Sequence, residues 1–136
     1  MDKAFFPSPE WIQATKEKFN TDEQYAQIAR NWEGDVRLII EPDGPLSEAT
    51  WFYWDLWHGK CRDAYVEDPS STTTPALIIK APYTNVRKIL TGEVGIMQAL
   101  MGRIVTVKGS MILLMRNVPT VIDFVRCCQE STSSWL

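Results

Sequence analysis

The sequence has few of the residues that build catalytic or metal sites, and no long apolar run. It contains one histidine, His58, and three cysteines among 136 residues. An odd number of cysteines, two of them adjacent at Cys127 and Cys128, disfavours a disulfide framework and favours a reducing cytoplasm. The longest apolar run, residues 111–115, is far shorter than the roughly 18 residues that a bilayer-spanning helix needs. The sequence therefore predicts neither a disulfide-rich secreted protein nor a membrane-spanning one.

The net charge and the absence of known motifs exclude several kinds of binding partner and cofactor. Lysine and arginine total 14 against 17 acidic residues, which gives a net charge of −3. This balance lacks the basic footprint of a nucleic-acid-binding protein, so we expect no nucleic-acid partner and at most transient membrane contact. The sequence also lacks glycine-rich nucleotide-binding loops, paired-histidine zinc motifs and serine-hydrolase elbows. We therefore predict no cofactor and no metal.

One short segment could hold a polar site. Asp55, His58, Cys61 and Asp63 lie close together in the sequence, but an extended strand would point Asp55 and His58 to opposite faces. Cys128 has no neighbouring base that would activate it as a nucleophile. We therefore predict no catalytic residues. A small enzyme acting on acyl or polyketide-like substrates through Asp55, His58 or Cys61 is the least favoured of three hypotheses.

The sequence is rich in aromatic residues, which make up 11% of the chain and include six tryptophans. Four of these tryptophans lie between Trp32 and Trp57. In the predicted strand 49–57, alternation places Thr50, Phe52, Trp54 and Leu56 on one face and residues 51, 53, 55 and 57 on the other. Both faces of this strand are apolar, so we expect both to be covered.

Periodicity and turn signals predict a mixed α+β fold in a single domain over residues 1–136. Pro119 should break the last helix near Asn117–Val118 and leave a hinged segment that could act as a lid. Residues after Glu130 are expected to form a frayed tail. The order of the predicted helices and strands along the chain favours a largely antiparallel sheet with helices on one face. The predicted helices lie within about 8–32 and at 83–90, 96–101 and from 111 onward, and the predicted strands at 36–41, 49–57, 60–67, 76–80 and 103–108.

Methionine is concentrated in the second half of the chain. Four of the five methionines fall between Met97 and Met115, and the run Met111–Met115 is apolar all round a helix. A helix that covers a sheet needs only an apolar stripe, so part of this run must contact something else. A methionine-rich core, a ligand pocket and a partner surface all fit this pattern.

Four segments in order resemble the sterol carrier protein type 2 domain family. The aromatic strand Ala49–Lys60 is similar to that family's tryptophan-bearing hairpin with its Gly-Lys turn. Leu90–Glu93, Gln98–Arg103 and Gly109–Met111 resemble, in turn, its Thr-Gly stop, its Ala-aromatic-Met segment and the start of its apolar helix. The resemblance covers roughly Trp32 to Val118.

This resemblance implies a five-stranded sheet with helices over one face and an apolar tunnel between them. It also implies binding and transfer of hydrophobic ligands: a fatty acid, acyl chain, sterol or phospholipid. Because bulky rings narrow a pocket, a slim acyl chain is as suitable a ligand as a sterol. A homodimer or enzyme-docking module that uses the apolar C-terminal helix is the alternative. The residues predicted to line the tunnel are Leu38, Ile40, Phe52, Trp54, Ile78, Met97, Met101, Ile104, Met111, Leu114, Met115 and Phe124.

Overall fold

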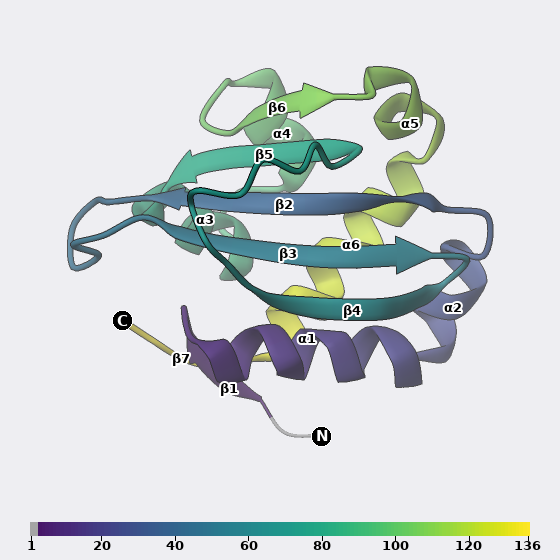
Figure 1. Cartoon of the computed structure of the whole chain (residues 1–136), viewed down its shortest axis with the longest axis horizontal. Coiled ribbons are helices and arrows are strands. Elements are labelled where there is room, and N and C mark those ends of the chain that lie inside the picture. Colours follow the sequence, from purple (N-terminus) through teal and green to yellow (C-terminus); the bar gives the residue numbers. More distant parts are fainter. Residues whose placement is uncertain (1–2) are drawn as a thin grey trace.

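The structure is a computed structural model that describes residues 3–136. Figure 1 shows one central sheet with helices behind it and a further helix along its lower edge. Within the described residues, no helix is both long and apolar enough to cross a membrane. In chain order the elements are β1 (Ala4–Phe6), α1 (Pro9–Thr21), α2 (Glu23–Ile28), β2 (Glu33–Glu41), β3 (Thr50–Trp57), β4 (Lys60–Glu67), β5 (Leu77–Pro82), α3 (Tyr83–Leu90), α4 (Ile96–Met101), β6 (Thr106–Gly109), α5 (Met111–Arg116), α6 (Val118–Glu130) and β7 (Thr132–Trp135).

The central sheet has five strands in the order β4-β3-β2-β5-β6. β2 and β5 are parallel, and the other three neighbouring pairs are antiparallel. In this register Val36 lies opposite both Trp54 and Leu77, which places their side chains on one face. The prediction of an α+β fold with a largely antiparallel five-stranded sheet is confirmed.

The helix-facing side of the sheet carries the predicted aromatic face of β3. Phe52, Trp54 and Leu56 are buried at 2% exposure or less. The indole N–H of Trp54 donates to the hydroxyl of Thr15 at 2.9 Å, so the ring's polar atom is satisfied within the core. The alternation read from the sequence therefore assigned the faces of β3 correctly.

Helix α6 is the central helix, and it contacts α1, α2, α3, α4 and α5 (Figure 1). Helix α1 runs along β4 and satisfies backbone groups at that sheet edge. Gln13 donates to the carbonyl of Ala64 at 2.7 Å, and the Asn20 amide both donates to and accepts from the backbone of Cys61. This edge is consequently closed to pairing with another strand.

Two local predictions are confirmed and one is wrong. His58 and Gly59 both have positive φ, at 50° and 78°, as a tight hairpin turn requires. The last helix breaks at Asn117, between α5 and α6. Residues after Glu130, however, are not a frayed tail, because β7 pairs in parallel with β1 and Trp11 donates its indole N–H to Thr132.

The other face of the sheet is crossed by the connection between β4 and β5, which passes in front of β3 and β2 (Figure 1). Beneath it, Arg37 and Glu67 form a buried ion pair with two hydrogen bonds of 2.6 and 2.9 Å. The same guanidinium group donates to Thr73 in the connection and lies 4.9 Å from the ring centre of Trp51. This network fixes the crossover over an aromatic surface.

The junction between β6 and α5 provides a test of the fold. Gly109 has φ +115°, and a Cβ there would lie 2.1 Å from the carbonyl oxygen of Ala76. We expect Gly109→Ala to lower the free energy of unfolding by more than about 2 kcal/mol, as measured by urea denaturation. Gly95→Ala is the matched control, since its Cβ would meet nothing within 4 Å. Equal stability of the two variants would contradict the structure at this junction.

Candidate functional site: an apolar space between the sheet and helix α6

Two small cavities lie between the sheet and the helices. Their volumes are about 30 and 50 Å³. Their walls are almost entirely aliphatic and aromatic, as in sites that bind hydrophobic molecules. The smaller is lined by Tyr25, Trp32, Val36, Leu56, Leu77, Ile79, Ile96, Leu100, Val107, Leu114, Thr120, Val121 and Phe124. The larger is lined by Trp11, Leu38, Trp54, Ile79, Ala81, Val86, Ile89, Leu90, Ile96, Val105, Phe124, Val125 and Cys128.

Three side chains line both cavities and form the partition between them: Ile79, Ile96 and Phe124. Phe124 is held by neighbouring rings. It packs edge-on to Trp54 at 5.1 Å and stacks on Phe19 at 5.0 Å. The aromatic surplus therefore contributes to closing this space.

A wider groove of about 320 Å³ lies outside the larger cavity, between α4 and α6. Ile96 and Val125 line both the groove and that cavity. The two cavities and the groove thus form a continuous series separated only by side chains. The groove is lined by Gly92, Val94, Gly95, Ile96, Met97, Gln98, Ile122, Val125, Arg126 and Gln129.

The structure divides the twelve residues predicted to line a tunnel into several groups. Leu38, Trp54, Leu114 and Phe124 line the two cavities, and Met97 lines the outer groove. The remaining seven line neither cavity nor the groove. Ile40 and Phe52 are fully buried in the core, and Ile104 is partly buried against it. Ile78 lies on the opposite face of the sheet, and three methionines are exposed at 83, 49 and 62%: Met101, Met111 and Met115.

Ile78 and Ile79 show why some lining residues were missed. The two are adjacent in an apolar strand that is too short for alternation to reveal its buried face. In the structure Ile79 lies opposite Leu38 and lines both cavities, whereas Ile78 lies opposite Arg37 on the other face. Ile96, Val121 and Val125 were also missed, although apolar residues at helical spacing are a usable signal for such positions.

A family model described as the SCP-2 sterol transfer family matches residues 12–121, which include every strand of the central sheet. The chain belongs to the SCP-2 sterol transfer family. The resemblance seen in the sequence is thereby confirmed. No curated protein sequence matches the chain.

Solved structures agree with this family. A crystal structure of sterol carrier protein 2 is 26% identical, with a TM-score of 0.82, over 92% of this chain and 98% of that chain. A protein from Thermus thermophilus, described as possibly a sterol carrier protein, is 27% identical, with a TM-score of 0.82, over 93% and 90%. Aedes aegypti sterol carrier protein 2 in complex with palmitate is 14% identical, with a TM-score of 0.56, over 87% and 93%. The last likeness shows the fold alone.

The residues proposed for catalysis do not converge in this SCP-2 family chain. Asp55 accepts two hydrogen bonds from Arg62 on the sheet face away from the helices, and the half-exposed His58 pairs with Glu33. Cys61 lies on the opposite face, where burial raises the pKa of its thiol to about 12. Burial likewise raises the pKa of Cys128 well above its ordinary value. Neither thiol is therefore activated as a nucleophile.

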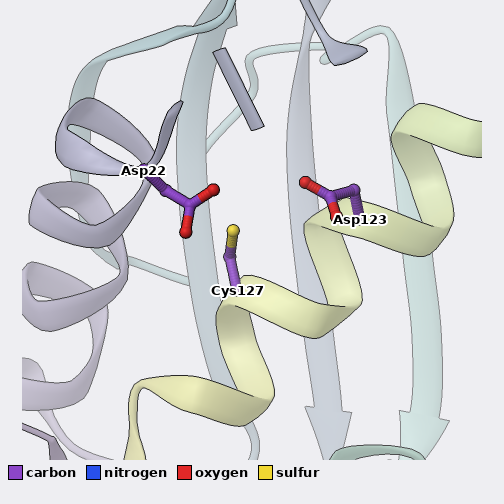
Figure 2. A group of neighbouring side chains, drawn as sticks. All are labelled: Asp22, Asp123 and Cys127. Carbon is purple, nitrogen blue, oxygen red and sulfur yellow. The ribbon is translucent and has the colours of Figure 1, made fainter. Parts of the chain in front are cut away.

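Asp22, Asp123 and Cys127 form the cluster most similar to a metal site in the described part of the chain. Their ligand atoms lie within 4.8 Å of one another, and Figure 2 shows Asp123 and Cys127 on one helix, with Asp22 opposite them. The guanidinium group of Arg126 already supplies the cation, at 2.6 Å from Asp22 and 2.7 Å from Asp123. Burial raises the pKa of Cys127 to about 12. This donor set therefore fits an internal ion pair better than a metal.

The same cluster joins the N-terminal helices to α6. Lys18 contacts Asp22 at 3.2 Å and Glu130 at 2.8 Å, and Arg126 also reaches Glu130. The hydrogen bond from Arg126 holds the pKa of Asp22 well below its ordinary value, and the hydrogen bond from Lys18 lowers the pKa of Glu130. These ion pairs hold α6 in place at the wall of the apolar space.

We expect this network to make stability sensitive to acid. Both carboxyl groups have folded pKa values below their unfolded ones, so their contribution to stability is present above the unfolded values of about 4 and is lost progressively as the pH falls below them. Asp22→Asn retains a side-chain oxygen to cap α2 but should lower the free energy of unfolding at neutral pH by about 1–2 kcal/mol. It should also flatten the acid limb of a urea-unfolding profile. Glu48→Gln, at an exposed site, is the control. An unchanged acid limb in Asp22→Asn would contradict this assignment.

Proposed function

We propose that this chain binds a slim hydrophobic ligand, such as a fatty acid or another acyl chain, between the sheet and α6, and transfers it. One observation carries the proposal: two apolar cavities and an outer groove follow one another, with Ile96 common to all three. Membership of the SCP-2 sterol transfer family supports it. The relative from Aedes aegypti in complex with palmitate supports an acyl chain as the ligand.

The two cavities are smaller than the volume that an acyl chain occupies. An empty tunnel of about 300 Å³ would cost about 7 kcal/mol at roughly 24 cal/mol per Å³. Cavities of about 30 and 50 Å³ cost far less. A small cavity volume therefore preserves most of the free energy of unfolding, which is about 5–15 kcal/mol for a typical domain. Ligand binding must then separate α4 and α6 from the sheet, at the partition formed by Ile79, Ile96 and Phe124.

The affinity expected for such a ligand suits a carrier. Burying about ten methylenes contributes roughly 8 kcal/mol, which corresponds to about micromolar affinity. A site of this kind releases its ligand readily. The rings of Trp54 and Phe124 narrow the space, which favours a flexible chain over a rigid sterol.

The proposed ligand walls are Leu38, Trp54, Leu114 and Phe124, together with Ile79 and Ile96. We also propose that the chain acts as a single non-catalytic domain in the cytoplasm. The three cysteines are all free and buried, which is consistent with a reducing compartment.

The first test is to identify what the protein carries. We expect organic extraction of the purified protein, followed by mass spectrometry, to release acyl lipids. A fluorescent fatty acid should bind with about micromolar affinity and be displaced by palmitate. Absence of both extractable lipid and displaceable binding would overturn the proposed function.

A pair of adjacent substitutions tests the location of the ligand. Ile79→Phe adds volume at the partition and should weaken binding of the fluorescent fatty acid about tenfold, at a stability cost of about 1–3 kcal/mol. Ile78→Phe makes the same chemical change on the opposite face of the same strand and should leave binding unchanged. Equal affinities of the two variants would place the ligand elsewhere. Circular dichroism and urea unfolding confirm that each variant is folded.

A further inference from the structure

The walls of the two cavities offer no partner to the polar end of a lipid. Their surfaces are apolar throughout, and among the described residues no charged side chain lines them. The hydrogen-bonding groups of four polar lining residues are already paired within the protein: Trp11, Trp32, Trp54 and Thr120. Tyr25 contributes its ring and not its hydroxyl to the smaller cavity, because no polar atom forms part of that surface. Burying an unpaired polar head is costly, so we expect the head to lie outside the cavities.

The outer groove between α4 and α6 adjoins the larger cavity and carries polar side chains. Gln98 is exposed on α4, and its amide has no hydrogen-bond partner within residues 3–136. Gln129 on α6 donates one amide N–H to the carbonyl of Ile89 at 2.9 Å, which leaves its amide oxygen able to accept a hydrogen bond. An acyl chain that enters past Ile96 and Val125, which line both spaces, would place its head beside these amides.

The charge of the groove is already balanced within the protein. Arg126 is the charged residue that lines it, and its guanidinium group contacts Asp22, Asp123 and Glu130 at 2.6, 2.7 and 3.2 Å. Lys18 adds a second cation through Asp22 and Glu130, so the network holds three carboxylates against two cations. A carboxylate head in the groove would therefore lie beside a network whose net charge is negative.

We propose that the groove between α4 and α6 holds the polar end of the bound lipid and selects an uncharged, hydroxyl-bearing head, such as that of a monoacylglycerol, over an ionised carboxylate. The proposal rests on the proposed function, since it concerns the other end of the same ligand. The free amide of Gln98 can donate to an ester oxygen and accept from a hydroxyl without an opposing charge. An ionised carboxylate would leave water without gaining an uncompensated cation, which disfavours its binding.

Two lipids with the same acyl chain test the selection. The fluorescent fatty acid bound to the full chain is displaced at neutral pH by palmitate or by monopalmitoylglycerol, each below the concentration at which it aggregates. We expect monopalmitoylglycerol to displace the probe at about one tenth of the palmitate concentration. The readout is the ratio of the two displacing concentrations, because this ratio does not depend on the affinity for the probe.

Two variants with matched controls assign the selection to the groove. Gln98→Leu removes the free amide and should reduce the preference for monopalmitoylglycerol about fivefold, whereas Gln27→Leu, at an exposed position of α2, should leave it unchanged. Glu130→Gln leaves Arg126 less neutralised and should reduce the preference about threefold by strengthening palmitate binding. Glu48→Gln makes the same change of charge at an exposed position outside the network and should have no effect. Circular dichroism confirms that each variant is folded.

Two outcomes would overturn the selection while the proposed function stands. They are displacement by palmitate at the same or a lower concentration than by monopalmitoylglycerol, and an equal change of preference in Gln98→Leu and Gln27→Leu. Displacement by neither lipid would overturn the proposed function, and the selection with it.

Discussion

The fold depends on covering β3, an interior strand of the sheet with aromatic rings on both faces. One face is covered by α1 and α6, where Trp54 packs edge-on against Phe124 and donates its N–H to Thr15. The other face is covered by the β4–β5 crossover and by the Arg37 guanidinium group over Trp51. The hydrophobic effect requires both covers, because either face left bare would expose a broad apolar patch.

Covering the helix side completely and holding the proposed ligand there are competing demands. In the structure the space is reduced to two small cavities, and side chains separate them from the outer groove. The covering helix α6 is attached at one end by ion pairs of Arg126 with Asp22 and Asp123. At its other end it continues through Asn117 into α5, where Leu114 is buried and Met111, Ile112 and Met115 are exposed.

Ion pairs are also distributed unevenly between the two edges of the sheet. The acidic network around Arg126 stabilises the closed packing of the N-terminal helices on α6, and it is satisfied internally. The opposite edge of the sheet has exposed cations and exposed methionines in place of such a network.

Features that depend on local interactions were predictable from the amino-acid sequence. Alternation assigned Phe52 and Trp54 to the helix face, the His58–Gly59 turn joined β3 to β4, and Pro119 placed the helix break beside Asn117. Family motifs supplied the ligand class. Tertiary structure alone decided that β7 pairs with β1, since no local signal reports a partner more than a hundred residues away. It also decided which methionines are exposed and that Ile79 rather than Ile78 faces the cavities, because short apolar runs gain a direction only from the elements packed against them.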